Sequence, residues 1–212
     1  MKLYDYFRSS AAYRVRIAMN LKELSADREF IHLRKGEQRG EAYRAINPQK
    51  LVPTLIDGDV TLSQSLAIIE YLDETKDGAA LLPADPVGRA RVRQLAEIIA
   101  CDIHPINNLR ILGYLTGKLG LSEEQRDEWY RHWVKEGFEA LEALLQNKAT
   151  GAFCHGDGPT LADICLVPQV FNGLRFKVDM APYPVINRIY AHCNTLPAFA
   201  EAKPDVQPDA EA

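Results

Sequence analysis

The first hundred residues of this 212-residue chain contain no cysteine, and no two of its four cysteines form a Cys-x-x-Cys pair. This absence excludes a dithiol redox motif near the N-terminus and a zinc ribbon anywhere. The five histidines also lack the His-x-x-x-His and His-Glu-x-x-His spacings, so nothing supports metal catalysis. We expect buried, reduced thiols, because free cysteine usually packs in protein cores. The cysteines are Cys101, Cys154, Cys165 and Cys193.

The chain also lacks an excess of basic residues and any long hydrophobic run. Its net charge of −4 argues against a nucleic-acid-binding protein. No apolar run approaches the roughly 20 residues that span a bilayer. The N-terminus has no apolar core of a secretory signal. With 47% hydrophobic and 25% charged residues, we expect an ordinary soluble, cytoplasmic protein without membrane partners.

The first 75 residues alternate strand and helix signals, which is typical of an α/β unit. We expect a first domain over residues 1–78. Asp57-Gly58, between two short apolar runs, predicts a hairpin with antiparallel strands. Strands are expected near 2–6, 28–32, 53–56 and 59–62, and helices near 11–22, 38–46 and 65–75.

After residue 78 the pattern changes. The Gly- and Pro-containing segment 76–86 predicts a linker, and residues 87–202 predict an all-helical domain. Long helices fit 87–117, kinked or interrupted at Pro105, and 122–146, with Trp129 and Trp133 on one face. Further helices are expected to begin after Thr160, whose spacing to Asp163 is a capping-box variant, and at Pro182-Tyr183-Pro184. The polar, proline-rich segment 203–212 predicts a flexible tail.

Ser9 and Ser10 follow the first expected strand and open the first expected helix. Unpaired N–H groups and the positive end of the helix dipole make this position suitable for an anion: a carboxylate, a phosphate or a thiolate. The alternative is that the serines only cap the helix. Arg14 and Arg16 are unfavourable at the positive end of a helix dipole, so we expect structural carboxylate partners for them.

Taken together, the motifs of the chain resemble the zeta class of the glutathione transferase family, the maleylacetoacetate isomerases. The resemblance covers nearly the whole chain. It implies a thioredoxin-like N-terminal domain, an all-helical C-terminal domain and a homodimer. The segments that carry it are Tyr6-Phe7-Arg8-Ser9-Ser10, Arg14-Val15-Arg16-Ile17-Ala18, Asn47-Pro48, Val52-Pro53-Thr54-Leu55, residues 64–72, Thr160-Leu161-Ala162-Asp163, residues 166–170 and Arg175-Phe176-Lys177-Val178-Asp179.

The resemblance implies glutathione as cofactor and assigns residues to it. Ser9 would stabilise the thiolate, with Ser10 as a second donor. Val52 would pair with the tripeptide through its main chain before a cis Pro53, although a proline at a strand start is more often trans. Gln64 and Ser65 would hold the γ-glutamyl carboxylate while Ser65 caps its helix. Further assignments are Gln49 and Lys50 near the glycyl end, and Asp102, His104 and Asn108.

The implied reaction is a cis–trans isomerisation in which the glutathione thiolate adds reversibly to a double bond. The substrate would be a maleyl compound with two carboxylates, which arginine binds well. Arg8, Arg110 and Arg175 are the candidates. The chain departs from the family at Ala11, where zeta enzymes commonly carry cysteine, and at Tyr13, where tryptophan is frequent.

Alternative functions follow from the same residues. Arg110 matches maleylpyruvate isomerases, so the substrate could be maleylpyruvate of a gentisate-type pathway instead of maleylacetoacetate of tyrosine and phenylalanine catabolism. Dehalogenation of small α-haloacids is a plausible side activity. A non-catalytic interaction module on this fold is disfavoured because the anion-binding residues remain. A glutaredoxin-like oxidoreductase would need a cysteine near Ala11.

Overall fold

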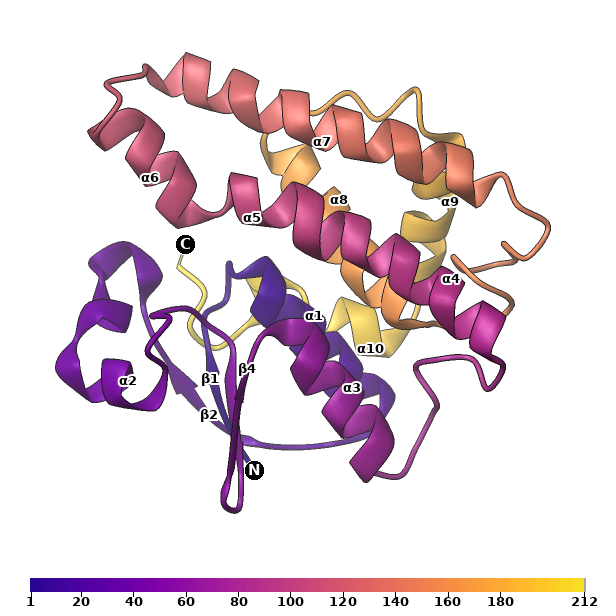
Figure 1. Cartoon of the computed structure of the whole chain (residues 1–212), viewed down its shortest axis with the longest axis horizontal. Helices are drawn as coiled ribbons and strands as arrows, with labels where there is room; N and C mark the ends of the chain where they lie inside the picture. The colour runs from indigo at the N-terminus through magenta and orange to yellow at the C-terminus, as the bar shows by residue number, and fades with distance from the viewer. Residues whose placement is uncertain (212) are drawn as a thin grey trace. The chain divides into compact units, whose positions relative to one another are not determined.

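The computed structural model describes residues 1–211, which form two compact units. The first comprises residues 1–81 together with the residues from Thr195 onward, and the second comprises Leu82–Asn194. The boundary after Leu81 falls within the segment 76–86 that we expected to be a linker. In Figure 1 the yellow C-terminal segment accordingly runs back to the indigo elements of the first unit.

Within the described residues, the first unit contains a four-stranded mixed sheet in the order β2-β1-β3-β4. β1 pairs in parallel with β2 and antiparallel with β3, and β3 forms an antiparallel hairpin with β4. Gly58, with a φ of +60°, supplies the left-handed conformation that the hairpin turn needs. The predicted hairpin is confirmed. The strands are β1 (Lys2–Asp5), β2 (Asp27–Phe30), β3 (Thr54–Asp57) and β4 (Val60–Ser63).

Helices α1 (Ser10–Leu21) and α3 (Ser65–Thr75) of the first unit pack on each other and bury much of their surface. The helix expected over 38–46 is shorter: α2 covers Glu41–Ile46, after the 3₁₀ turns η1 (Leu33–Lys35) and η2 (Glu37–Arg39). Gly36 is left-handed and Gly40 is extended, and both conformations interrupt an α-helix.

A buried ion pair holds α1 against the sheet. Asp5, which is 0% exposed, accepts from the Arg16 guanidinium at 2.7 Å and also from Arg28. Arg16 further donates to the Phe7 carbonyl at 3.0 Å and to the Ala202 carbonyl at 3.0 Å. The predicted carboxylate partner of Arg16 is therefore confirmed. Burial lowers the pKa of Arg16, and the Asp5 carboxylate opposes that effect.

The C-terminal segment is folded, which corrects the predicted flexible tail over 203–212. It contains α10 (Pro197–Ala200) and the 3₁₀ turn η4 (Pro204–Val206). Pro204 and Gln207 are buried, and the Gln207 amide donates to the carbonyls of Glu201 and Lys203 at 2.8 and 2.7 Å. Specific backbone contacts thus compensate for the polar composition. Ala212, the last residue of that predicted tail, lies outside the described residues.

The second unit is helical, as predicted, but residues 195–202, which we expected to belong to it, are part of the first unit. The first long helix of the second unit is interrupted. The π-helical turn η3 (Ile98–Ile103) lies between α4 (Pro86–Glu97) and α5 (His104–Asn107), and α6 (Leu109–Gly117) follows. Pro105 has no N–H for the carbonyl four residues earlier, which explains the widened turn directly before it. The later helices are α7 (Glu123–Leu145), α8 (Leu161–Arg175) and α9 (Pro184–Cys193). Trp129 and Trp133 share a face of α7, with ring centroids 5.6 Å apart, as expected.

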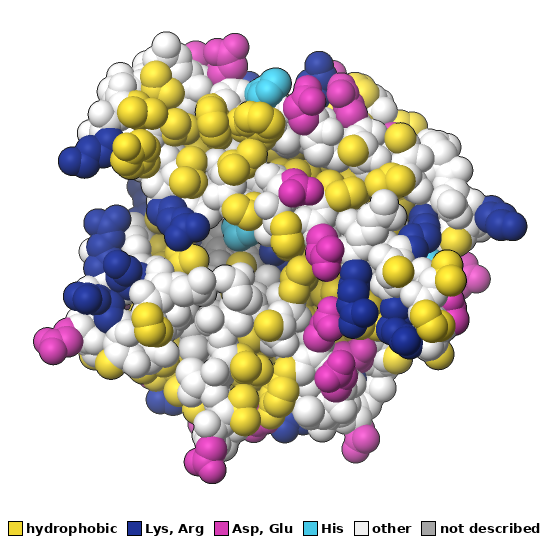
Figure 2. All heavy atoms as spheres, viewed as in Figure 1, with side chains coloured by type: hydrophobic (Ala, Val, Ile, Leu, Met, Phe, Trp, Pro, Cys, Tyr) yellow, Lys and Arg dark blue, Asp and Glu magenta, His cyan; other side chains and the backbone are white. Residues whose placement is uncertain are grey.

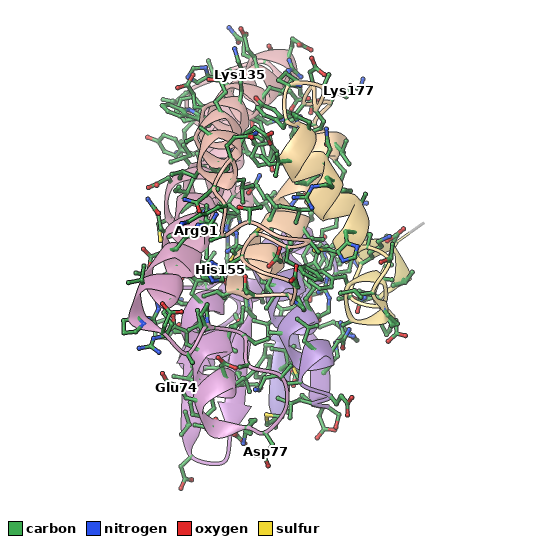
Figure 3. All side chains as sticks on the ribbon, turned by 90° about the vertical axis from the view of Figure 1, so that its right-hand side faces the viewer. Glu74, Asp77, Arg91, Lys135, His155 and Lys177 are labelled. Atoms are coloured by element: carbon green, nitrogen blue, oxygen red, sulfur yellow. The ribbon has the colours of Figure 1, made fainter. Side chains whose placement is uncertain are left out.

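The predicted capping box opens α8. Asp163, which is 0% exposed, accepts from the backbone amides of Thr160 and Cys154, each at 2.8 Å. Burial raises the pKa of Asp163, and these hydrogen bonds oppose that effect. Arg91 of α4 fixes the preceding loop by donating to the Cys154 carbonyl at 2.7 Å, and it lies beside His155 (Figure 3).

Three of the four thiols fit the predicted burial. Cys154, Cys165 and Cys193 are buried, and burial raises the pKa of Cys154 and of Cys193. Cys101 is exposed, so the prediction is wrong for that residue. It lies in η3, where the widened turn presents it at the surface. None of the helices described in residues 1–211 has both the length and the apolar character needed to cross a membrane.

Candidate active site

The sheet brings the predicted glutathione residues of the first unit to one of its ends. Tyr4 pairs with Thr54, and Thr54 pairs with Ser63 across the antiparallel ladders. The segments that follow β1, precede β3 and follow β4 therefore all lie at the same end of the sheet. Those segments carry Ser9 and Ser10, Val52 and Pro53, and Gln64 and Ser65.

Ser9 is the N-cap of α1 and is only partly exposed. Its backbone is extended (φ −71°, ψ 118°), and its Oγ accepts from the Ala12 amide at 3.2 Å. Capping uses the hydroxyl as an acceptor, so its proton remains available to donate to an anion. The capping interpretation and the anion-binding interpretation are thus compatible. Ser10 is buried as the first residue of the helix.

The segment before Ser9 is apolar and buried. Tyr6 and Phe7 pack in one cluster with Tyr43 and Val52. Arg8 extends from this segment with its guanidinium carbon 5.0 Å from the Phe7 ring centroid. Burial raises the pKa of Tyr6, and the positive charge of Arg8 opposes that effect. Arg8 therefore places a positive charge beside Ser9 in sequence.

The peptide bond between Val52 and Pro53 is cis, as the resemblance implied. Val52 lies beyond the paired residues of β3, which begin at Thr54. Its side chain is 6% exposed, in the cluster with Tyr6 and Phe7. Its main chain is therefore held at the end of the ladder, where an added extended peptide could pair with it.

Gln64 adopts an uncommon backbone conformation at the N-terminus of α3. Its φ is +72° and its ψ is 117°, a region that non-glycine residues rarely occupy. Its side chain donates to Gln49 Oε1 at 3.1 Å. Among the described residues, no side chain caps α3. The first amides of that helix are consequently presented to solvent or ligand.

Ser65 does not cap α3, which corrects our expectation. It is the first residue inside the helix, 5% exposed, and its hydroxyl accepts from Arg14 Nη1 at 3.2 Å. A residue in the first turn has helical dihedrals, whereas a cap is non-helical, and the non-helical residue before α3 is Gln64. Arg14 thus places a buried positive charge beneath the open helix N-terminus, a contact that the sequence analysis did not assign to it.

Gln49 and Lys50 form the loop before β3. Asn47 shapes it by accepting from the Gln49 amide at 2.9 Å through its side chain and from the Lys50 amide at 3.0 Å through its carbonyl. Lys50 is left-handed (φ +59°) and exposed. Figure 2 shows basic side chains gathered over the part of the first unit that holds α2, where Arg44 and Lys50 are exposed.

These groups fit glutathione, whose tripeptide carries two carboxylates, a thiol and a peptide backbone. The open N-terminus of α3, with Arg14 beneath Ser65, suits one carboxylate. Lys50 suits the other. The free edge at Val52 suits the backbone, and the hydroxyl at the N-terminus of α1 suits a thiolate.

The second unit carries the remaining candidates, and they differ in setting. Asp102 is exposed in η3, and His104 begins α5. Asn108 is the N-cap of α6: its Oδ1 accepts from the Arg110 and Ile111 amides, each at 3.2 Å. The structure therefore gives Asn108 a capping role. Arg110 is exposed in the first turn of α6.

Arg175, the last residue of α8, is exposed and hydrogen-bonded. It donates to Asn172 Oδ1 at 2.7 Å and borders a surface hollow of about 360 Å³. Next to it, Phe176 stacks on Tyr130 with ring centroids 3.7 Å apart, and burial raises the pKa of Tyr130 to about 12. The stacked rings fix the end of the helix from which Arg175 projects. The other residues around the hollow are Glu124, Asp127, Arg131 and Lys177.

Two contributors at the end of the sheet escaped the sequence analysis. Arg14 was expected to be purely structural, and its position in the helix that follows Ser9 was the available signal. Asp209 accepts from the Phe7 amide at 2.9 Å, and no local pattern links residues so far apart in the chain. Within residues 1–211, no group of three His, Cys, Asp or Glu side chains could hold a metal ion.

Comparisons with known proteins agree with this geometry. The family model for the glutathione S-transferase N-terminal domain matches residues 8–75, and that for the C-terminal domain matches residues 127–191. A probable maleylacetoacetate isomerase of Vibrio cholerae is 53% identical over 98% of this chain and 97% of its own length.

Solved structures agree equally well. The holo structure of a maleylpyruvate isomerase, a bacterial zeta-class glutathione S-transferase, has a TM-score of 0.97 and 50% identity, with both chains fully covered. A maleylacetoacetate isomerase from Methylobacterium extorquens AM1, solved with malonate and glutathione, has a TM-score of 0.97 and 43% identity, again with full coverage. The chain therefore belongs to the glutathione S-transferase family and is a close relative of its zeta class.

Proposed function

We propose that this protein is a glutathione-dependent cis–trans isomerase that converts maleylacetoacetate to fumarylacetoacetate. The observation that carries the proposal is the convergence of the N-termini of α1 and α3 with Val52 at one end of the sheet. Relatives at about half identity over their full length are named for this reaction and for the isomerisation of maleylpyruvate.

Ser9 is assigned to the thiol. Because an ordinary cysteine thiol has a pKa near 8.5, only a small fraction is thiolate at neutral pH without help. The Ser9 hydroxyl, already positioned by its capping bond to Ala12, donates toward the sulfur, and the dipole of α1 favours the negative charge. Ser10 is the second donor.

The ends of the tripeptide are assigned to charged and polar groups. The γ-glutamyl carboxylate is held by the open N-terminus of α3, by Gln64 and by the Ser65 hydroxyl that Arg14 orients. Gln49 and Lys50 serve the glycyl carboxylate, with Val52 pairing along the backbone. Asp102, His104 and Asn108 remain assigned to glutathione by resemblance alone, and capping occupies the side-chain oxygen of Asn108.

The chemistry that glutathione supplies when bound is reversible addition of its sulfur to the double bond, which permits rotation before elimination. The protein then has to bind a substrate with two carboxylates and stabilise the charge that addition creates. Arg8, Arg110 and Arg175 are the assigned donors, because guanidinium groups bind carboxylates bidentately.

Replacing Ser9 by alanine tests the role assigned to its hydroxyl. Ser9→Ala should abolish most turnover, leave glutathione affinity nearly unchanged and cost about 1 kcal/mol of stability through the lost cap. Ser122→Ala is the matched control, since Ser122 caps α7 with a similar bond (3.2 Å to the Gln125 amide) outside the assigned residues. It should lose similar stability and keep full turnover. Unimpaired turnover in Ser9→Ala would refute the assigned role.

A second candidate is isomerisation of maleylpyruvate, favoured by the exposed Arg110 in the first turn of α6. Initial rates with each maleyl substrate, with and without glutathione, separate the two. Faster turnover of maleylacetoacetate supports the first assignment. Preference for maleylpyruvate, lost in Arg110→Ala, supports the second. No glutathione-dependent turnover of either substrate would refute both.

We also infer a cytoplasmic homodimer from the family. Light scattering coupled to size-exclusion chromatography measures the mass directly. A mass of about twice 23.8 kDa supports the dimer. A monomeric mass at micromolar concentration would refute it.

A further inference from the structure

The end of the chain contacts the segment that leads into Ser9. Asp209 Oδ2 accepts from the backbone amide of Phe7 at 2.9 Å, across 202 positions of sequence. Phe7 lies between β1 and the N-cap of α1, so this carboxylate acts on the backbone two residues before the Ser9 side chain. Such a long-range bond at an irregular turn restrains a segment that sheet and helix leave free.

Two other hydrogen bonds fix the same turn, residues 6–9, through its backbone carbonyls. Arg16 donates to the Phe7 carbonyl at 3.0 Å, and the Ser9 amide donates to the Tyr6 carbonyl at 2.9 Å. The Phe7 amide and the Phe7 carbonyl are therefore both engaged by charged side chains. With the position of Phe7 fixed on both sides, the rotation of the backbone toward Ser9 is restricted as well.

Asp209 is itself held between two anchored neighbours. On one side, Gln207 is 6% exposed and donates to the Glu201 and Lys203 carbonyls. On the other, Ala210 packs against the cluster that contains Tyr6 and Phe7, and Glu211 pairs with His32 at 2.6 Å. The pairing with His32 lowers the pKa of Glu211. This segment is thus a strap, residues 207–211, fixed at both ends over the turn.

We propose that Asp209 is a positioning residue that sets the Ser9 hydroxyl for thiol activation by holding the Phe7 amide. The proposal rests on the function proposed above. A displacement of about 1 Å at a reacting group can lower the rate about a hundredfold, so loss of a single backbone contact at this turn should change the turnover rate measurably. Glutathione binding should depend on it little, because Gln64, Ser65 and Val52 lie on other segments.

Positioning of Ser9 by Asp209 can be distinguished from a field effect, meaning the direct electrostatic effect of the Asp209 charge on the bound thiol. A nearby carboxylate disfavours a thiolate, so a field effect predicts that removing Asp209 lowers the pKa of the bound thiol. Positioning predicts the opposite, because a displaced Ser9 donates less well. Asp209→Asn removes the charge and keeps an oxygen that can accept from Phe7, so it separates the two effects.

The experiment compares Asp209→Ala and Asp209→Asn with the wild-type chain and with Asp205→Ala, an exposed aspartate of η4 in the same C-terminal segment. The ultraviolet absorbance of the thiolate, followed against pH, gives the pKa of bound glutathione. Calorimetry gives its Kd, and initial rates with the maleyl substrate give kcat. Amide hydrogen exchange at Phe7 and Ser9 reports the contact itself.

We expect Asp209→Ala to raise the bound-thiol pKa, lower kcat about tenfold and leave the glutathione Kd within about twofold, with faster exchange at Phe7. Asp209→Asn should restore most of the rate, and Asp205→Ala should match wild type. An unchanged thiol pKa and rate in Asp209→Ala, or a lower thiol pKa in both Asp209 variants, would overturn the proposal.

Two further arms keep the outcomes separable. If Asp209→Ala does not fold, Asp209→Leu, which keeps a branched side chain of similar size but has no acceptor oxygen, must show the same rise in thiol pKa; otherwise the proposal fails. The exchange measurement needs no substrate. A wild-type chain without glutathione-dependent turnover would refute the proposed function, whereas unchanged Phe7 exchange in Asp209→Ala would refute the strap contact alone.

Discussion

At the scale of single residues, the backbone of Gln64 is the most unusual feature of the proposed glutathione site. A non-glycine residue with a φ of +72° and a ψ of 117° costs roughly 1–3 kcal/mol relative to a relaxed conformation. In exchange, the chain turns so that its amide side chain reaches Gln49 and α3 begins without a side-chain cap among the described residues. The conformation is consistent with a position selected for binding more than for stability.

Gln64→Gly should therefore change stability and binding in opposite directions. Relief of the dihedral strain, less the entropy cost of glycine, should raise the free energy of unfolding by about 1 kcal/mol. Loss of the amide contacts should weaken glutathione binding about tenfold or more, since a hydrogen bond to a charged group contributes roughly 1.5–3 kcal/mol. Urea unfolding and calorimetric titration measure the two quantities.

Glu23→Gly provides the control for Gln64→Gly. Glu23 is exposed and has a φ of +55°, in a turn that is not assigned to any ligand. Its replacement should also stabilise the chain but leave the glutathione Kd unchanged. Lower stability of Gln64→Gly would contradict the strain argument, and unchanged affinity would remove Gln64 from the site.

Single-residue predictions succeeded where the determinants are local. Ser9 follows a strand and opens a helix, so its cap could be read directly from neighbouring residues. The cis bond before Pro53 came from the family resemblance. Ser65 was misassigned because helix start positions are uncertain by a residue or two, and the cap is Gln64 instead. Asp209 could not be found because its partner depends on the tertiary fold.

At the scale of helices and strands, the interruption of the first long helix determines how the second unit packs. Ile103 ends the π-helical turn and lies against Gly137 of α7: an added Cβ at Gly137 would be 2.2 Å from Ile103 Cδ1. Ile103 is 1% exposed, so it has little freedom to move. Gly137 thus permits close approach of α7 to the widened turn that carries Asp102.

Gly137→Ala should destabilise the protein by about 1–3 kcal/mol, although alanine is the better helix former, because it overpacks this contact. Urea unfolding measures the change. Gly113→Ala in α6, where nothing lies within 4 Å of the added Cβ, should instead stabilise by about 0.5–1 kcal/mol. In the double variant with Ile103→Ala, the two costs should be less than additive. Strict additivity would show that the clash is not the cause.

Helices were predicted well where caps and hydrophobic periodicity agree. The expected 65–75 and 122–146 helices are close to α3 and α7, and Thr160 with Asp163 opens α8 as a capping box. The region 33–46 was less predictable, since Gly36 and Gly40 divide it into short turns whose conformations follow from glycine dihedrals. The interruption at Pro105 was anticipated, but its π-helical form was not.

At the scale of the whole molecule, the first unit is built from both ends of the chain. Phe199 is 0% exposed, its carbonyl accepts from the Tyr13 hydroxyl at 3.5 Å, and the Ala198 carbonyl accepts from Asn20 at 3.0 Å. Composition predicted a loose tail after residue 202, because proline and acidic residues are typical of disorder. Pro204 and Gln207 are nevertheless buried, and Ala210 packs against the cluster that contains Tyr6 and Phe7, a long-range contact that could not be seen in the tail itself.

Removal of residues 195–212 should therefore unfold the first unit. Loss of one buried phenylalanine alone costs about 3–5 kcal/mol, a large part of the 5–15 kcal/mol that typically stabilises a domain. Hydrogen exchange measured by mass spectrometry should show loss of protection in α1 and β1, with α7 and α8 still protected. A chain lacking only Ala212 is the control. Retained protection of α1 in the truncated chain would contradict this account.

The position of α10 and η4 in the first unit also has a consequence for biosynthesis. A ribosome releases the N-terminal strands and α1 long before the residues that cover them. The segment beginning at Thr195 emerges after the helical unit, so the first unit cannot reach its final packing until these later residues have left the ribosome. Domains of nascent chains generally fold in N-to-C order. Here the helical unit, although it is the second unit along the chain, is the first whose residues have all been synthesised, because it ends at Asn194.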